Sequence, residues 1–373
     1  MASKIEKSVK VFGAALDATD NPIKILAKRS YLNRLAQKIM ENNIDIKDPY
    51  EGFLLYSRLL SKKRFNKIGK FNIASWLRPK PNIEDYLSID AINYQDFINS
   101  GSITEVSNEL EQFVQKQVLS DISFMIGVDH SLTGGVLHAM ARNYGAINIL
   151  VIIFDAHFDA IPASLFLKLA RFAKGQKEKI HSLIDLDLID ENIEITDTYN
   201  CASFIDYLIK EKIVLPQNLI VFGCQDYPNE DLKSKENPNI KDYVNFYLDF
   251  EKKGVNFVSV NEDRKKMIEK FKDILQNVST PYVYISIDVD VGTFKEVLAT
   301  RFMNIIGIEK EVILDAAKEI KRYMKVRNCD LIGLDVMEVE TYMLNKELKK
   351  SAKKDKTIEL VDDFLEVIFD QVI

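Results

Sequence analysis

The chain is poor in the residues that mark several large classes of protein. Its 373 residues include only three cysteines, at positions 201, 224 and 329, which are too few and too far apart for a zinc cluster or a disulfide framework. No apolar run approaches the ~20 residues that span a bilayer, and the N-terminus lacks the charged start and apolar core of a signal peptide. We therefore expect a cytoplasmic protein with no membrane partner.

Basic charge is not in excess either. The formal net charge is -6, and the chain has no nucleic-acid-binding motif, no repeats and no phosphate-binding glycine loop. The basic residues within 16–70 and 346–356 are therefore interpreted as solvated helix faces or connectors. We expect no nucleic-acid partner.

Histidine is scarce, yet its placement is informative. Two of the four histidines stand among aspartates in three short segments, GVDHS at 127–131, DAHFD at 155–159 and SIDVD at 286–290. Each segment follows an apolar run typical of a buried parallel strand, at 121–126, 148–154 and 282–287. Ligands bind outside the carboxyl ends of such strands, so the three segments are expected to meet in one crevice.

The spacing inside these segments suits metal coordination. Alternate residues of an extended segment point the same way, so 155, 157 and 159 can share a direction, as can 288 and 290. Any one segment alone would be an ordinary turn, helix cap or core histidine. Together they predict a metal site formed by His130, Asp155, His157, Asp159, Asp288 and Asp290. These donors exceed what one tetrahedral zinc needs, and two manganese ions with bridging carboxylates fit best.

The hydrophobic pattern predicts an α/β fold, namely a three-layer, doubly wound sheet of about eight mostly parallel strands with helices on both faces. The expected strands are 9–14, 71–74, 121–126, 148–154, 219–222, 255–260, 282–287 and 331–334. The expected helices include 104–117, 132–143, 164–180, 261–276, 309–325 and 357–372. No linker divides the chain, so residues 1–373 are interpreted as one domain, with a helical elaboration at about 16–70 and an insertion at about 160–198.

The three segments resemble the motifs of the ureohydrolase family, which includes arginases and agmatinases. Those motifs are Gly-Gly-Asp-His-Ser, Asp-Ala-His-x-Asp and Ser-x-Asp-x-Asp, and they occur here in family order with Val128 in place of the second glycine. A fourth piece, Asp335-Val336-Met337-Glu338, is similar to the family's late Asp-x-x-Glu. The resemblance implies an arginase-like fold and a homo-oligomer, a trimer or hexamer.

The resemblance also implies a centre of two Mn²⁺ ions per chain. One ion would be held by His130, Asp155, Asp159 and Asp288, and the other by Asp155, His157, Asp288 and Asp290. A water between the ions would become a hydroxide that attacks an sp2 carbon. Asp159 would help to move its proton. Glu338 would pair with a guanidinium or amidinium group through two parallel hydrogen bonds, although an ordinary surface glutamate at a strand end is an equal alternative.

Several positions depart from the family pattern. Cys201 stands where family members have a histidine that serves proton transfer or substrate binding, and a small, inert, packed cysteine is the alternative. His181 is a second candidate for that proton transfer, against a solvated loop histidine. The family's Arg-x-Gly-Pro loop is missing from 16–70, and the residues that hold a free amino acid are not evident at 160–164. Residues 165–195 are interpreted as a lid, with a solvated charged excursion or a subunit contact as the alternative.

These observations predict a hydrolase that cleaves a C–N bond of a small cationic guanidino or amidino compound, releasing urea or a related amide. Free L-arginine is not the first choice of substrate. The alternatives are a metal-binding scaffold of the same fold that has lost turnover, and a one-ion zinc deacetylase. A two-metal phosphoesterase is disfavoured because it needs further histidines downstream, and none follows His181.

Overall fold

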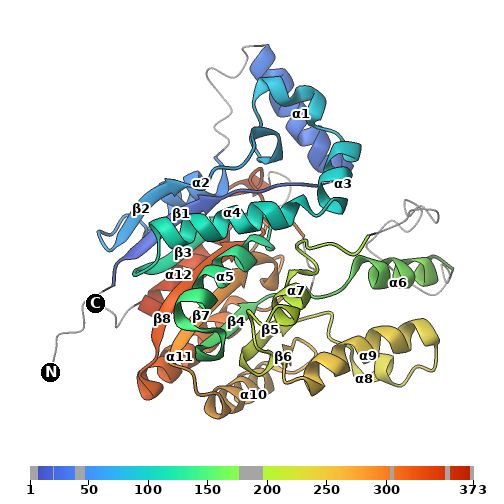
Figure 1. The fold of residues 1–373 in the computed structure, drawn as a ribbon, viewed down its shortest axis with the longest axis vertical. Helices are drawn as coiled ribbons and strands as arrows, with labels where there is room; N and C mark the ends of the chain where they lie inside the picture. Colours follow the sequence, from blue (N-terminus) through green and yellow to red (C-terminus); the bar gives the residue numbers. More distant parts are fainter. Residues whose placement is uncertain are drawn as a thin grey trace.

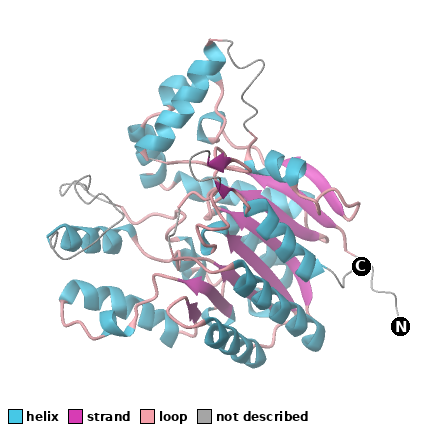
Figure 2. Ribbon diagram, turned by 180° about the vertical axis from the view of Figure 1, so that it is seen from behind, coloured by secondary structure: helices cyan, strands magenta, loops and turns pink. Residues whose placement is uncertain are grey.

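The computed structural model describes residues 7–19, 21–37, 47–175, 196–302, 306–348 and 353–369. A central eight-stranded sheet carries helices on both faces (Figures 1 and 2). Its strands are β1 (Val9–Ala14), β2 (Phe65–Lys70), β3 (Ile122–Gly127), β4 (Ile149–Phe154), β5 (Leu219–Cys224), β6 (Asn256–Ser259), β7 (Tyr282–Asp288) and β8 (Asp330–Met337). The helices are α1 (Pro22–Ala36), α2 (Pro49–Tyr56), α3 (Ala91–Asn99), α4 (Ser102–Gln117), α5 (Leu132–Tyr144), α6 (Ala163–Gly175), α7 (Phe204–Lys210), α8 (Glu230–Lys233), α9 (Pro238–Lys252), α10 (Arg264–Asn277), α11 (Lys310–Arg327) and α12 (Thr357–Phe369).

The sheet is parallel throughout, whereas the sequence predicts a mostly parallel one. The strand order is β2-β1-β3-β8-β7-β4-β5-β6, and every neighbouring pair runs in the same direction. Parallel neighbours need crossover connections, and helices supply them. The four strands that precede the motifs, β3, β8, β7 and β4, are therefore adjacent at the centre of the sheet.

Each face of the sheet packs against its own set of helices. In β4, Leu150, Ile152 and Phe154 join one core cluster, while Ile149, Val151 and Ile153 join the other. This is the period of two expected of a strand, and it explains why the strand is apolar along its whole length. Helices α2, α10, α11 and α12 cover the first face, and α4, α5, α7 and α9 cover the second. The central strands are thereby held rigidly, which fixes the positions of their carboxyl ends.

The second strand of the sheet differs from the prediction. The sequence predicts a strand at 71–74, but the strand is β2 at Phe65–Lys70. β2 is an edge strand that is largely exposed after Phe65, so its sequence lacks an apolar signal. Phe71 and Ile73 are buried in the adjoining core without belonging to the sheet, which is why they resemble a strand. The other predicted strands are confirmed with shifted bounds.

The elaborated regions are described in part. The range 16–70, predicted as a helical elaboration, contains α1 and α2, and its last residues form β2. The predicted helix at 164–180 is α6, and its final residues, with His181 and most of the acidic segment that follows, lie outside the described residues. The lysine-rich connector includes a short antiparallel pair, β9 (Glu347–Leu348) and β10 (Lys353–Lys354). The single-domain organisation stays a prediction.

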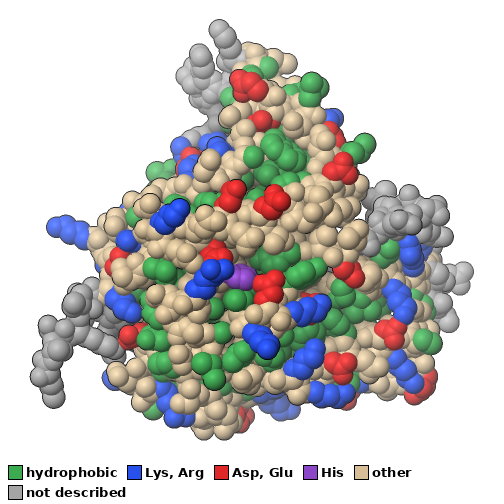
Figure 3. Space-filling model, in the orientation of Figure 1, with side chains coloured by type: hydrophobic (Ala, Val, Ile, Leu, Met, Phe, Trp, Pro, Cys, Tyr) green, Lys and Arg blue, Asp and Glu red, His purple; other side chains and the backbone are tan. Residues whose placement is uncertain are grey.

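The surface offers no single-sign charge field on the face seen in Figure 3, where acidic and basic side chains are interspersed. Within the described residues, no helix is both long and apolar enough to cross a bilayer.

Candidate metal centre

Side chains from the ends of three central strands meet at the carboxyl edge of the sheet. His130 follows β3, residues 155–159 follow β4, and Asp288 and Asp290 end β7. The structure brings all six predicted ligands into two groups able to hold a metal ion. Strand order explains this convergence, because β4 and β7 are neighbours and β8 alone separates β7 from β3.

The first group surrounds one nitrogen of His130. Nδ1 of this imidazole lies 2.9 Å from Asp159 Oδ2, 3.2 Å from Asp155 Oδ2 and 3.3 Å from Asp288 Oδ2. A ring nitrogen carries at most one hydrogen, so it cannot satisfy three carboxylates. All four side chains are buried. The arrangement has the form of a coordination shell around a shared cation.

The second group adjoins the first through Asp155. It contains Asp155, His157 and Asp290, with His157 Nδ1 2.9 Å from Asp290 Oδ2 and 3.5 Å from Asp155 Oδ1. His157 is partly exposed, whereas both carboxylates are buried. Asp155 belongs to both groups, as the resemblance implies for a bridging ligand. Asp288, the other implied bridge, is gathered with the first group only.

Backbone amides orient these carboxylates. The amide of His157 donates to Asp155 Oδ1 at 2.7 Å, and the amide of Asp290 donates to Asp288 Oδ1 at 2.9 Å. These are local turns in which an aspartate accepts from the residue two positions ahead. Asp159 has a left-handed backbone, with φ of 52°, an unfavourable conformation that clusters at functional sites. Short turns at strand ends thus set the direction of each ligand.

Burial dominates the electrostatics of the two groups. It raises the pKa of Asp159 and of Asp288 well above the usual value, and neighbouring aspartates add to both shifts. Burial also opposes ionisation of Asp155, but hydrogen bonds from His130 and His157 hold its pKa to about 2. Four carboxylates therefore share a low-dielectric space with two imidazoles. Divalent cations would supply the missing positive charge, so the donor set fits two such ions with oxygen and nitrogen ligands.

The far side of His130 is held by a network that the sequence did not reveal. Nε2 lies 2.9 Å from Ser286 Oγ, and Ser286 donates to Asp335 Oδ1 at 2.5 Å. Tyr284 and Thr133 donate to the other oxygen of Asp335. All of these residues are buried. The signal available in the sequence was a tyrosine and a serine inside an otherwise apolar strand, each of which needs a hydrogen-bond partner when buried.

Glu338 lies beside this centre and faces an unexpected cation. Its Oε1 accepts a hydrogen bond from the amide of His130 at 3.0 Å and lies 3.6 Å from Nη1 of Arg301. The same Nη1 is 3.1 Å from Oδ2 of Asp129, whose other oxygen accepts from the amide of Ser131. Burial raises the pKa of Glu338 to about 7 although Arg301 opposes the shift. No local pattern in the sequence marks Arg301, so its place beside Glu338 is visible only in the structure.

Cys201 lies near the same charges. It precedes α7, is half-buried, and is close enough to Asp129 and Glu338 for their charges to act on its thiol. Burial and these carboxylates raise the pKa of the thiol well above its ordinary value, which favours the neutral form. A neutral thiol is a poor acceptor of protons, so these features favour a packing role over proton transfer. The other candidate, His181, lies outside the described residues.

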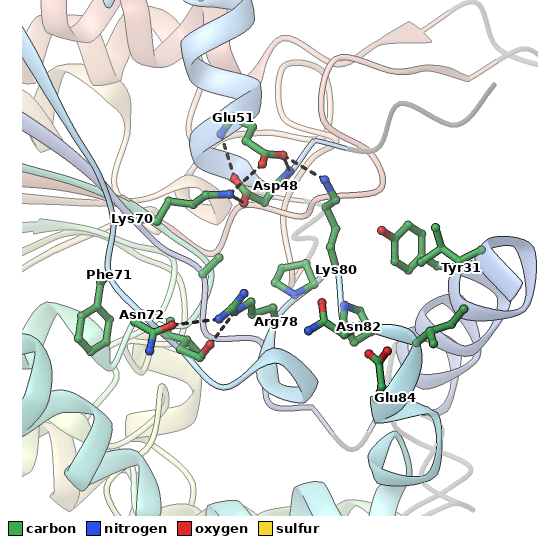
Figure 4. Close-up of a pocket in the computed structure, with 16 residues that line it drawn as sticks. Tyr31, Asp48, Glu51, Lys70, Phe71, Asn72, Arg78, Lys80, Asn82 and Glu84 are labelled. Atoms are coloured by element: carbon green, nitrogen blue, oxygen red, sulfur yellow. Dashed lines mark hydrogen bonds and ion pairs between the residues drawn. The ribbon is translucent and has the colours of Figure 1, made fainter. Parts of the chain in front are cut away.

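A separate pocket of about 470 Å³ opens past the carboxyl ends of β1 and β2 (Figure 4). Lys70 and Lys80 both bind Glu51 on one wall, and Arg78 donates to the carbonyl of Ile73 at the floor. Figure 4 shows Tyr31 on the opposite side. The lining includes none of the six predicted ligands, so this pocket is not the metal centre.

Comparisons with known proteins agree with the motifs. A family model described as "Arginase family" matches residues 66–354. A comparison with curated protein sequences finds no match.

Among solved structures, the chain is similar to proclavaminate amidino hydrolase from Streptomyces clavuligerus, with a TM-score of 0.55, 18% identity, and coverage of 98% of this chain and 93% of that one. Arginase from Bacillus caldovelox gives a TM-score of 0.55 and 14% identity over 98% and 99% of the two chains. Formimidoylglutamase from Bacillus subtilis gives a TM-score of 0.56 and 16% identity, with coverage of 99% of this chain and 88% of that one. At these identities the likeness shows a shared fold.

Proposed function

The chain belongs to the arginase family, and we propose that it is a hydrolase with two divalent metal ions that cleaves a C–N bond of a guanidino or amidino compound. The observation that supports this most strongly is the pair of ligand groups that share Asp155. A one-ion zinc centre, as in a deacetylase, would leave the second group without a role.

We propose manganese as the metal. The six ligands are four carboxylates and two imidazoles, and such oxygen-rich sites suit manganese better than soft metals, which prefer thiolates. When bound, two such ions would lower the pKa of a coordinated water and offset negative charge that develops on the substrate. Each ligand residue must therefore hold a fixed orientation, which the strand-end turns and the Ser286–Asp335 network support.

The residues around the ligands have distinct roles in this proposal. Water adds to the amidino carbon, the C–N bond breaks, and the departing nitrogen takes up a proton. Asp159, whose carboxylate belongs to the first ligand group and is the most exposed of that group, would accept the proton from the attacking water and pass it to that nitrogen. Glu338 would accept a hydrogen bond from the substrate through Oε2, since Oε1 is occupied by the amide of His130. The fold shared with an amidino hydrolase supports an amidino carbon as the reacting group.

Oligomeric state, drawn from the resemblance, and compartment, drawn from the cysteine content and the lack of long apolar runs, remain proposals. We expect a homo-oligomer, a trimer or hexamer, in the cytoplasm. Sedimentation of the purified protein would measure the state directly.

A second candidate function is a metal-binding scaffold without turnover. It is favoured by two observations, the raised pKa of the Cys201 thiol and the internal cation beside Glu338. Such a protein would keep the buried ligands, because they stabilise the fold when a metal is bound.

Hydrolysis distinguishes the two functions. The manganese-loaded protein is incubated with a panel of guanidino and amidino compounds, and release of urea, ammonia or amide is measured beside Asp155→Ala. We expect turnover in the wild type and a loss of at least a hundredfold in the variant. Two tightly bound metal ions with no turnover across the panel would support the scaffold, and failure to bind metal would refute both functions.

A further inference from the structure

Arg301 is a buried cation in a position that no sequence motif assigns. Its side chain is 4% exposed, and Nη1 lies between Asp129 Oδ2, at 3.1 Å, and Glu338 Oε1, at 3.6 Å. Nη2 donates to the carbonyl of Ala18 at 2.5 Å. A guanidinium that is this deeply buried persists only when several acceptors compensate its lost hydration. Arg301 is therefore an integral part of the wall beside the metal centre.

The backbone places Arg301 opposite Glu338. Thr300 and Val339 form an antiparallel bridge, the amide of Arg301 donates to the carbonyl of Glu338 at 2.8 Å, and the amide of Glu340 donates to the carbonyl of Ala299 at 3.0 Å. Residues 299–301 thus run alongside residues 338–340, directly after β8. Glu338 itself has a left-handed backbone, with φ of 59°. These three backbone contacts fix the register of the two segments, so the side chains of Arg301 and Glu338 lie next to each other.

A second ion pair holds the far side of Arg301. Asp17 Oδ1 lies 3.8 Å from Nε of Arg301, and Asp17 Oδ2 lies 2.9 Å from Nζ of Lys28. Lys28 belongs to α1, is fully buried, and also donates to the hydroxyl of Tyr94 at 3.2 Å. The elaboration at α1 therefore has a structural role at the site, because it braces the carboxylate that lies against Arg301. Removing Arg301 would take away the one guanidinium that Asp17, Asp129 and Glu338 share, while Lys28 and Lys24 would still act on Asp17.

Glu338 consequently has only one carboxylate oxygen left with which to bind another group. Oε1 accepts from His130 and faces Arg301, and only Oε2 has no hydrogen-bond partner among the described residues. A fork of two parallel hydrogen bonds needs both oxygens of the carboxylate. A second guanidinium at Glu338 would also lie within a few ångströms of Arg301 in a low-dielectric space, where like charges repel strongly.

We propose that Arg301 is a specificity-determining residue that supplies an internal guanidinium to Glu338, excludes free cationic guanidinium groups from it, and restricts the reacting group to an uncharged amidino group with one hydrogen bond to Oε2. This narrows the substrate class of the proposed function and rests on that function in taking Glu338 as the carboxylate next to the reacting carbon. It departs from the prediction from the sequence, in which Glu338 pairs with a cationic group of the substrate through both oxygens.

Chemical rescue tests the proposal. The thermal midpoint Tm of manganese-loaded wild type, Arg301→Ala and Arg301→Lys is measured against low millimolar guanidinium chloride and methylguanidinium, with sodium and tetramethylammonium chloride at matched ionic strength. We expect Arg301→Ala to lose on the order of 10 °C in Tm and to regain a few degrees, saturably, with guanidinium or methylguanidinium only. Wild type and Arg301→Lys should show no specific rise, because their own cation fills the position.

Two further variants act as controls. Arg142→Ala removes an exposed arginine that pairs with Glu111 and should behave like wild type. The double variant Arg301→Ala with Glu338→Gln should show a smaller guanidinium-specific rise than Arg301→Ala alone, because Asp129 and Asp17 still face the vacated position. If Arg301→Ala does not fold, Arg301→Gln replaces it, since glutamine keeps hydrogen-bond donors without the charge.

Two outcomes would overturn the proposal. One is a guanidinium-specific rise in the Tm of wild type as large as that in Arg301→Ala. The other is no such rise in either Arg301→Ala or Arg301→Gln when the variant is folded. The rescue experiment measures binding of guanidinium and does not depend on turnover. Its failure can therefore be distinguished from failure of the proposed function, which would appear as missing metal or missing turnover.

Discussion

The Nε2 atom of His130 lies 2.9 Å from the hydroxyl oxygen of Ser286. Because Ser286 donates its own hydrogen to Asp335 at 2.5 Å, its oxygen accepts from Nε2–H, and this leaves the Nδ1 lone pair directed at the carboxylates of the first ligand group. The hydrogen bond to Ser286, on the side of the ring away from the ligand group, thus sets the tautomer that His130 needs to bind a metal through Nδ1. Partners of this kind orient ligands and strengthen metal binding.

Replacing Ser286 by alanine should therefore weaken metal binding without abolishing it. We expect a fall in manganese affinity of about tenfold to a hundredfold, measured by competition with a chelator. Ser123→Ala is a matched control, since Ser123 is buried in β3 and its hydroxyl has no hydrogen-bond partner among the described residues. Equal affinities in both variants would contradict a role for Ser286.

Metal content should depend on which ligand is removed. Asp155 belongs to both groups, so Asp155→Asn should reduce the bound metal toward zero, whereas Asp290→Asn should retain about one ion per chain. Elemental analysis of the purified proteins measures the ratio. Asp129→Asn serves as the control, because Asp129 binds Ser131 and Arg301 and is outside both groups. Equal loss in Asp155→Asn and Asp290→Asn would argue against two groups that share Asp155.

Phe158 should be the largest single contributor to packing near the site. Its ring is fully buried between the rings of Phe250 and Phe257, with centroids 4.9 and 4.8 Å away. Phe158→Ala should lower the free energy of unfolding by about 3–5 kcal/mol, measured by urea denaturation. Phe166→Ala, at a position 52% exposed, should change it by less than about 0.5 kcal/mol. Similar effects would mean that the buried cluster is not the source of stability.

Gly223 should tolerate no side chain. Its φ is 104°, and an added Cβ would lie 2.5 Å from Val291 Cγ2 and 3.1 Å from the carbonyl oxygen of Asp155. Gly223→Ala should cost about 3 kcal/mol or more from strain and overlap together. Gly69→Ala shares the strain, with φ of 96°, but meets no atom within 4 Å and should cost about 1–2 kcal/mol. Denaturation curves of the two variants separate the cost of backbone strain from the cost of steric overlap. Equal losses of unfolding free energy in the two variants would refute a contribution from overlap at Gly223.

Lowering the pH should show how much the ion pairs of Glu51, at the pocket in Figure 4, contribute to stability. Burial favours the neutral form of Glu51, but bonds from Lys70, the amide of Asp48 and Lys80 lower its pKa from 4.5 to about 2. A carboxyl whose pKa is lower in the folded state stabilises above its unfolded pKa and loses that contribution as pH falls through the folded value. Between pH 4.5 and about 2, the wild type should therefore lose stability more steeply than Glu51→Gln.

Urea denaturation at several acidic pH values measures the two slopes. Glu84→Gln is the control, because Glu84 lines the same pocket and is exposed. It should keep the wild-type slope. A Glu51→Gln slope as steep as the wild type would show that the ion pairs do not contribute.

The strands and the two candidate ligand groups could be predicted because their signals are local. β4 and β7 are apolar at successive positions, and their ligands follow within a few residues at alternate spacing. β2 was misplaced because an exposed edge strand has no apolar pattern, whereas Phe71 and Ile73 are buried outside the sheet. The lid, the single domain and the roles of individual site residues stay predictions.

The sequence by itself determined which six side chains gather as candidate metal ligands and that strand ends carry them, since alternation and turn chemistry act over a few residues. Only the tertiary structure decided what surrounds them. Ser286 meets His130 across 156 positions, and Arg301 meets Asp129 across 172. The strand order that places β8 between β3 and β7 makes such contacts possible. Pairings of this kind depend on the packing of the whole sheet, and no short stretch of sequence encodes them.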